Sequence, residues 1–116
     1  SYLENPDYHF FVVAWDLPGT DPEAFRKINK MFEKAEQADI SMIVLTATLK
    51  EKIEKFIGQT AISTEMPFYN ADDIALKTMI RSNPGLILMK DGRVIDKWHH
   101  NNLPDWEEIE DEYLNQ

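Results

Sequence analysis

Three histidines carry the side chains in this sequence that most readily bind a metal ion. His99 and His100 are adjacent, and His9 or Asp96 is available as a third ligand. Neighbouring residues of a strand point to opposite faces, so an adjacent pair is poorly placed to chelate one ion. We therefore interpret the histidines as solvated side chains at a strand end, and we predict no metal site.

An acidic run near the C-terminus is the second concentration of ligand-type side chains. Its carboxylates are Glu107, Glu108, Glu110, Asp111 and Glu112. A calcium loop needs a glycine that turns the chain between its oxygen ligands, and this run contains none. Negative charge is favourable in the first turn of a helix, so the run is typical of a solvated helix face.

This sequence offers few side chains that could act as a catalytic nucleophile. The sequence has no cysteine, which excludes disulfide bonds, thiol catalysis and thiolate metal sites within it. Thr20 is the remaining candidate nucleophile, but a hydroxyl attacks only with the help of an adjacent base. Since the sequence shows no such base, we interpret Asp16 and Thr20 as turn and cap residues. We predict no catalytic residue and no cofactor.

The composition narrows the class of partner. A chain of 116 residues fits one domain, and its net charge is −9. That charge, without a basic stripe, argues against nucleic acid and against anionic membrane surfaces. No apolar run approaches the roughly 20 residues that cross a bilayer, so this segment is not expected to insert into one. A protein or peptide is the expected partner.

The periodicity of apolar residues predicts an α/β domain in the order β-α-β-α-(β)-α-β-β-α. Strands are predicted at residues 10–15, 41–46, 67–69, 86–89 and 93–98. Helices are predicted at residues 22–38 and 49–58, from a cap at Asn70 or Asp72 to about residue 81, and from 104 onward. Strands that alternate with helices form parallel pairs, and the final hairpin makes the sheet mixed. Residues 1–9 are predicted to be a linker or N-terminal arm, and residues 10–116 a single domain.

Several element boundaries have local signals. Asp21 can cap the first helix with Pro22 at its first position, although a Thr20-x-x-Glu23 capping box is a competing start. Asp91-Gly92 between two apolar runs predicts a two-residue hairpin turn. Helical spacing predicts buried side chains in the second and third helices. These are Leu49, Ile53, Phe56, Ile57, Ile74, Leu76, Met79 and Ile80, and Gly58 is the expected end of the second helix.

The stretch at residues 80–92, IRSNPGLILMKDG, resembles the signature of thioredoxin-like proteins. That signature is an aliphatic residue, Arg, two variable residues, Pro, a small residue, an aliphatic run, Lys, Asp or Asn, and Gly. The resemblance implies a cis peptide bond before Pro84. It also places the redox cysteines of such proteins between the first strand and its helix, within residues 16–21 here, where this chain has none. The extra helix and short strand before Asn70 resemble the TlpA and peroxiredoxin branch.

A second resemblance concerns the whole chain. Residues 11–17 (FVVAWDL), 45–48 (LTAT), 76–85 (LKTMIRSNPG) and 97–99 (KWH) are similar to the soluble C-terminal region of bacterial DoxX-family membrane proteins. The resemblance implies a parent protein with a small bundle of membrane helices and no settled reaction. The sequence begins with Ser1 and without a signal-peptide pattern, which favours a processed chain or a fragment. TlpA-like relatives imply a tethered, periplasmic location in the cell envelope, and the cytoplasmic face is the alternative.

We expect any binding surface to lie where two loops meet. Sites in open α/β sheets form outside the carboxyl ends of the strands, and no comparable convergence is expected at His99 and His100. The predicted surface consists of Trp15, Asp16, Leu17, Pro18, Gly19, Thr20, Asn83, Pro84 and Gly85. Leu17, Pro18 and Gly19 would give apolar contact and open backbone, with Trp15 as an aromatic anchor. The Pro84 turn either pairs with an extended peptide or is a structural turn that the fold requires.

The sequence therefore predicts a binding or scaffolding module of a DoxX-family membrane protein, without redox or other enzymatic activity of its own. Its partner is a protein or peptide, such as the membrane-embedded part of its own parent chain. One alternative is a domain that positions substrates for thiol-disulfide chemistry at cysteines elsewhere in the parent. A stand-alone, chaperone-like peptide binder is a further alternative.

Overall fold

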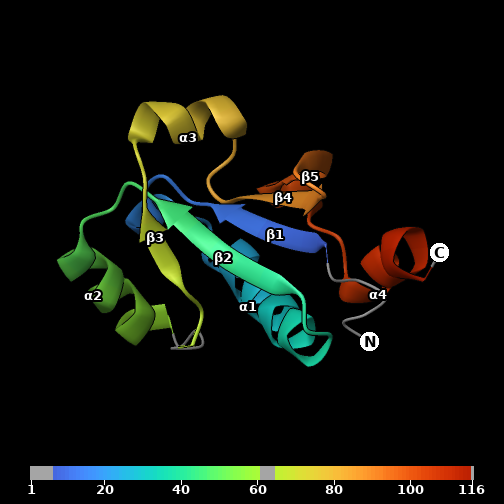
Figure 1. Ribbon diagram of the computed structural model, residues 1–116. Helices are drawn as coiled ribbons and strands as arrows, with labels where there is room; N and C mark the ends of the chain where they lie inside the picture. Colours follow the sequence, from blue (N-terminus) through green and yellow to red (C-terminus); the bar gives the residue numbers. More distant parts are fainter. Residues whose placement is uncertain (1–6, 61–64, 116) are drawn as a thin grey trace.

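A five-stranded mixed sheet forms the centre of the molecule, with the strand order β3-β2-β1-β4-β5 (Figure 1). The structure is a computed structural model that describes residues 7–60 and 65–115. The strands are β1 (Tyr8–Val13), β2 (Ser41–Thr46), β3 (Phe68–Asn70), β4 (Gly85–Lys90) and β5 (Arg93–His99). β1 pairs in parallel with β2 and antiparallel with β4. The predicted element order is confirmed.

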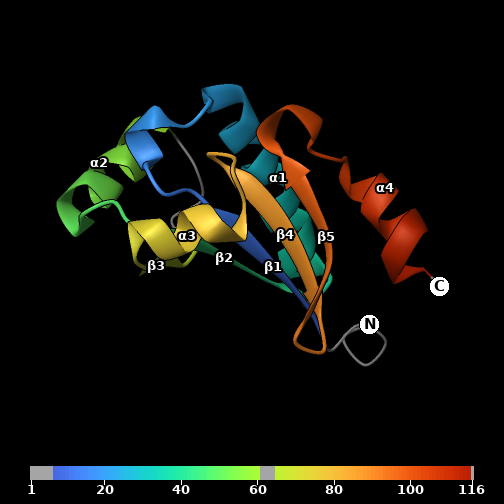
Figure 2. The same ribbon diagram turned by 90° about the horizontal axis from the view of Figure 1, so that it is seen from above.

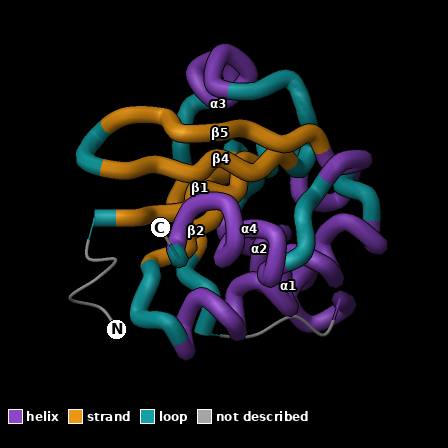
Figure 3. Tube along the Cα trace, turned by 90° about the vertical axis from the view of Figure 1, so that its right-hand side faces the viewer, coloured by secondary structure: helices purple, strands orange, loops and turns teal. Residues whose placement is uncertain are grey.

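Helices cover the two faces of the sheet unequally. The helices are α1 (Pro22–Gln37), α2 (Lys50–Thr60), α3 (Asp73–Met79) and α4 (Trp106–Ile109), with η3 (Glu110–Leu114) continuing α4 and short turns at η1 (Leu17–Gly19) and η2 (His100–Asn102). α1, α2 and α4 lie on one face, while α3 alone lies on the other (Figure 3). Within residues 7–60 and 65–115, no helix has the length and apolar character needed to cross a membrane.

The larger core fills the space between the sheet and α1, α2 and α4. Its aromatic contacts include Phe10 with Trp106 at 6.0 Å and Phe25 with Phe56 at 5.1 Å between ring centroids. A smaller cluster of Val13, Leu76 and Ile87 lies under α3. The β4–β5 hairpin extends beyond α3 (Figure 2), and Val94 and Ile95 remain exposed there. The core is therefore thick on one side of the sheet and thin on the other.

Local chemistry sets several of the boundaries. Asp21 caps α1 by accepting a hydrogen bond from the Glu23 backbone N–H, with Pro22 at the first position. The competing start at Thr20 is wrong, because the Thr20 hydroxyl donates to the Leu17 carbonyl. Between β4 and β5, Asp91 and Gly92 have φ values of 52° and 77°. Both positive angles fit the two-residue turn that the sequence predicts.

Several predicted boundaries need correction. β1 ends at Val13 rather than Trp15, and α3 ends at Met79 rather than near Arg81. β1 begins at Tyr8, so residues 8 and 9 belong to the sheet rather than to a linker, while the rest of that predicted arm, up to residue 6, lies outside the described residues. α2 continues past Gly58 to Thr60. A glycine in a helix interior costs only about 1 kcal/mol, which packing of the helix offsets. Asp105 caps α4, so Pro104 precedes that helix instead of starting it. Residues 59 and 60 belong to α2, and residues 61–64 lie outside the described residues.

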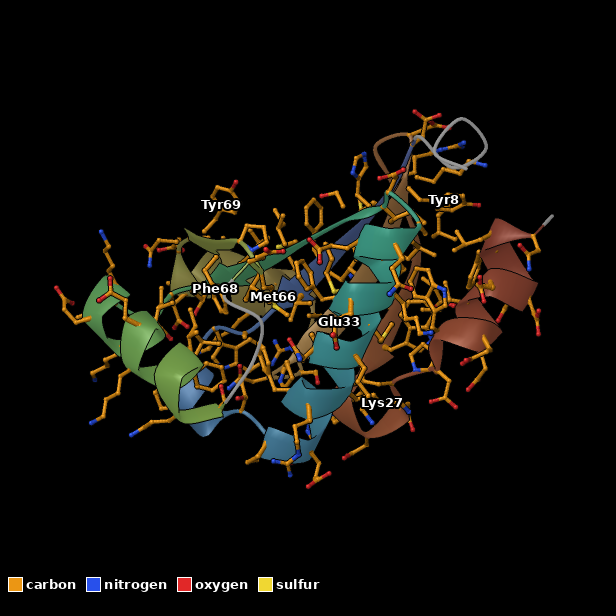
Figure 4. All side chains as sticks on the ribbon, turned by 90° about the horizontal axis from the view of Figure 1, so that it is seen from below. Tyr8, Lys27, Glu33, Met66, Phe68 and Tyr69 are labelled. Atoms are coloured by element: carbon orange, nitrogen blue, oxygen red, sulfur yellow. The ribbon has the colours of Figure 1, made fainter. Side chains whose placement is uncertain are left out.

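Two predicted core residues are exposed. Leu49 is 64% exposed and Ile74 is 73% exposed. Leu49 precedes the first turn of α2, and α2 covers the sheet edge beside β3, where Phe56 is its buried residue. α3 has only seven residues and buries Leu76. In both places the helix is too peripheral to bury a full apolar face. Figure 4 shows the better-covered side, with Lys27 between α1 and the C-terminal segment and Tyr8 beside the C-terminal helix.

Candidate functional site

Two loops far apart in sequence meet at one edge of the sheet. The end of β1 is paired with the start of β4, where Val13 lies opposite Gly85. Because the two strands are antiparallel, the chain that leaves β1 and the chain that enters β4 lie side by side. Ala14 N–H then donates to the Leu45 carbonyl at 2.9 Å, which holds the first loop against β2. This is the convergence that the sequence predicts.

The side chain of Asn83 joins the two loops. Its Nδ2 donates to the Asp16 carbonyl at 2.8 Å, and the Asp16 N–H donates to Asn83 Oδ1 at 3.4 Å. One amide group thus pairs with both backbone groups of one residue, as a neighbouring strand would. The shorter bond is well formed and the longer one is at the limit of useful geometry. This Asn83–Asp16 pair fixes the position of the loop after β1.

A third loop supports the same turn from inside. The Leu17 N–H donates to Thr48 Oγ1 at 2.9 Å, and the Thr48 N–H donates to Thr46 Oγ1 at 3.1 Å. Leu17 is fully buried in the larger core, and Thr48 is also buried. The prediction that Leu17 contacts a partner is therefore wrong. In the 3₁₀ turn η1 its side chain points inward while that of Pro18 remains exposed.

The turn before β4 is held from the other side by Ser82. The Asn83–Pro84 peptide bond is cis, as the resemblance to thioredoxin-like proteins implies. The Ser82 hydroxyl donates to the Pro84 carbonyl at 2.7 Å and accepts from the His100 N–H at 2.9 Å. Ser82 is only 3% exposed, so both bonds are made in the interior. Sequence reasoning missed this residue, since its partner at η2 is distant along the chain.

Only part of the predicted surface faces solvent. Asp16, Pro18 and Gly19 are exposed and Asn83 is half-buried, and we call these four residues the loop surface. Leu17, Thr20, Pro84 and Gly85 are buried. A Cβ atom added at Gly19 would lie 2.6 Å from Asp16 Oδ2. The absence of a side chain at Gly19 therefore leaves the Asp16 carboxylate in place and the backbone open.

Trp15 borders the loop surface on the side of α3. It is half-buried, and Lys77 Nζ lies 5.8 Å from the centroid of its ring. Lys77 also forms an ion pair with Asp73 at 3.0 Å. A cation over an indole face is a weak attraction at an exposed site. Trp15 is thus partly exposed, as the sequence predicts, and is partly covered by α3.

Two cavities lie near these loops. The first, which we call the Pro18–α2 cavity, has a volume of about 280 Å³ and is lined by Pro18, Lys52, Lys55, Phe56 and Gln59. A larger cavity of about 570 Å³ lies between α1 and η2, and His100 is among its lining residues. The prediction that nothing converges at the histidines is therefore incomplete, because η2 passes alongside the N-terminal half of α1.

The chemistry available at these positions is limited. The Thr20 hydroxyl donates to the Leu17 carbonyl at 2.8 Å, so it acts as a turn-closing group. His99 and His100 have ring centroids 4.2 Å apart, and His100 Nδ1 lies 3.9 Å from Asp21 Oδ2. In the part of the chain that the structure describes, no three His, Cys, Asp or Glu side chains are grouped so as to hold a metal ion. The loop surface offers hydrogen bonds and shape to a partner.

Comparison of the sequence with protein-family models and with curated proteins gave no match. Solved structures do match. StoA from Bacillus subtilis is 9% identical, with a TM-score of 0.66 over 90% of this chain and 81% of that chain. A thiol-disulfide oxidoreductase from Bacteroides fragilis is 14% identical, with a TM-score of 0.63 over 78% of this chain and 71% of its own. A thioredoxin-like protein from Parabacteroides distasonis is 15% identical, with a TM-score of 0.61 over 90% of this chain and 78% of its own.

The chain has a thioredoxin-like fold. The fold class predicted from the sequence is confirmed, and the loop surface lies at the edge where the resemblance places the redox cysteines. This chain has no cysteine at that edge or elsewhere. At such low identity the likeness is one of fold, and a fold does not fix a function.

Proposed function

We propose that this domain is a redox-inactive thioredoxin-like module that binds a protein or peptide at the loop surface. The observation that carries the proposal is the Asn83–Asp16 pair, which fixes two loops in one arrangement at the edge of the sheet. A surface that is already ordered loses less conformational entropy on binding. The exposed Pro18 and the open backbone at Gly19 provide contact without a reactive group.

The proposed setting follows from the resemblance to DoxX-family membrane proteins. In that setting the domain is tethered to a bundle of membrane helices, and the partner is the membrane-embedded part of its own parent chain. The domain lies on the periplasmic side of the cell envelope, and the cytoplasmic face is the alternative. The net charge of −9 disfavours direct contact with anionic lipid, which supports a protein partner.

Site-specific photo-crosslinking in the full-length parent protein, in its own membranes, tests this proposal. A photoreactive phenylalanine analogue replaces Pro18 at the loop surface or, as a matched control, Asp91 in the exposed β4–β5 turn at the opposite end of the sheet. We expect crosslinks from position 18 to a defined membrane-proximal segment of the parent and none from position 91. Equal crosslinking from the two positions, or none from position 18, contradicts the proposal.

A second candidate function is the positioning of substrates for thiol-disulfide chemistry carried out by cysteines elsewhere in the parent. It is supported by the similar fold of the thiol-disulfide oxidoreductase from Bacteroides fragilis. Thiolate is the attacking group in disulfide exchange, so the reactive cysteine must then come from outside this domain. Reduction of a disulfide substrate by the full-length parent distinguishes the two functions. Turnover that falls when the domain is deleted favours substrate positioning, and no turnover favours the binding module.

A further inference from the structure

One face of α2 combines basic, aromatic and amide side chains. Lys52, Lys55, Phe56 and Gln59 recur at the spacing i, i+3, i+4, i+7, which places them along one side of a helix. The same four residues line the Pro18–α2 cavity, opposite Pro18. The remaining charged residues of the helix do not line it. The cavity therefore has an apolar pair, Phe56 and Pro18, with two lysines and one amide at its rim.

The two lysines are free to bind an anion. Within residues 7–60 and 65–115 the ion pairs of the basic side chains involve Arg26, Lys27, Lys77 and His100, and none reaches Lys52 or Lys55. Both lysines are exposed. In a chain with a net charge of −9, these two cations make the rim of the recess locally positive.

The larger cavity between α1 and η2 differs because most of its cations are paired within the protein. Of its cations, Arg26 is paired with Glu23, and Lys27 is paired with Asp105 at 3.2 Å. Its Lys27 Nζ also donates to the Leu103 carbonyl at 2.8 Å. Of the cations Arg26, Lys27 and Lys30 that line it, the first two are thus paired within the protein. In the Pro18–α2 cavity, neither of the two lysines has an ion-pair partner among the described residues, and Pro18 connects the cavity to the loop surface.

We propose that the Pro18–α2 cavity binds an acidic peptide segment, with one apolar side chain in the recess and neighbouring carboxylates on Lys52 and Lys55. The volume of about 280 Å³ is at the lower end of ligand pockets and suits one or two side chains. A short acidic motif needs only the local positive charge. A nucleic acid or an anionic membrane extends far enough to meet the negative charge of the whole domain.

This inference rests on the proposed function and extends it, because Pro18 belongs to both the loop surface and the cavity. A segment bound at the loop surface needs only a short extension past Pro18 to reach α2. The cavity would then provide the sequence preference, since its apolar recess and its two lysines select different features of the peptide. The loop surface would contribute contacts to backbone that do not depend on sequence.

The test is binding of a fluorescent probe peptide to the chain, measured by anisotropy and mapped by backbone amide chemical shifts. The probe has one leucine followed by three aspartates in a Gly/Ser background, and a control peptide has lysines in place of the aspartates. The double variant Lys52→Glu with Lys55→Glu is compared with Lys34→Glu with Lys50→Glu. The control pair makes the same change in net charge at exposed lysines that do not line the cavity.

We expect the cavity variant to weaken binding of the acidic probe about tenfold or more, because two attractions become two repulsions, and the control variant to weaken it about twofold or less. The lysine peptide should bind neither protein specifically. On binding of the acidic probe, the backbone amide signals of α2 residues and of Asn83 should both shift.

Other results separate the two proposals. Three results would each overturn the inference. They are equal weakening of probe binding in both double variants, no saturable binding of the acidic probe, and binding of anionic phospholipid vesicles in place of the probe. Shifts at Asn83 and Asp16 that are unaffected by the cavity variant also overturn it, while the proposed function stands. Shifts on α2 with none at Asn83 support the cavity and count against the proposed function.

Discussion

The replacement Thr48→Val tests how the loop after β1 is held in place. Thr48 Oγ1 is the acceptor for the buried Leu17 N–H at 2.9 Å. Valine has nearly the same shape as threonine but no hydroxyl, so the change leaves that N–H in the core without this partner. A buried donor without a partner costs about 1–3 kcal/mol, and we expect the free energy of unfolding to fall by that amount.

Urea unfolding measures this loss, and hydrogen exchange locates it. The Leu17 amide should lose protection in Thr48→Val and keep it in Thr48→Ser, which retains the acceptor oxygen. Thr78→Val is the matched control, because the Thr78 side chain is exposed and its hydroxyl donates to the Ala75 carbonyl of its own helix at 2.6 Å. Its unfolding free energy should change by about 0.5 kcal/mol or less. If Thr48→Val lowers the unfolding free energy no more than the control does, or leaves the Leu17 amide protected from exchange, the reasoning about this loop is refuted.

Two further replacements test packing and charge. Gly85→Ala places a Cβ 2.8 Å from Ile80 Cδ1, so we expect it to lower the unfolding free energy by about 1–3 kcal/mol in urea titration; a neutral result would mean that Ile80 moves freely. Partial desolvation and the carboxylates of Glu65 and Glu33 raise the pKa of Glu36 above that of an ordinary glutamate, so the folded state favours its protonated form. Its charge therefore destabilises the fold as pH rises through that raised pKa. Glu36→Gln should raise the melting temperature at pH 7 and not at pH 3, and an equal gain at both would contradict this cause.

Local sequence signals were sufficient where the structure depends on neighbouring residues. The Asp91-Gly92 turn and the cap at Asp21 with Pro22 are of this kind, because each depends on backbone preferences within a few residues. The order of strands and helices follows from periodicity for the same reason. These signals, together with the resemblance at residues 80–92, led to the correct fold class.

The details of the site depend on contacts that a local pattern does not contain. Leu17 and Pro18 are both apolar residues of one turn, yet η1 directs Leu17 into the core and leaves Pro18 exposed. Thr48 is 31 positions from the Leu17 amide that it accepts, and Ser82 is 18 positions from the His100 amide. The residues next to each hydroxyl in the sequence do not indicate its distant partner, so neither role was predictable. The helical spacing of Lys52 and Lys55 on α2 is visible in the sequence, but their position beside Pro18 in one cavity is not.

The most direct test of the binding surface is a titration of the isotope-labelled domain with the remainder of its parent protein in lipid nanodiscs. Backbone amide signals report on each residue separately. We expect signals from Trp15, Asp16, Gly19 and Asn83 to shift or broaden, and those of the β4–β5 turn at residues 91–92 to stay unchanged. Changes confined to that turn, or no change at any concentration, would contradict the claim that the edge where β1 ends and β4 begins is the binding surface.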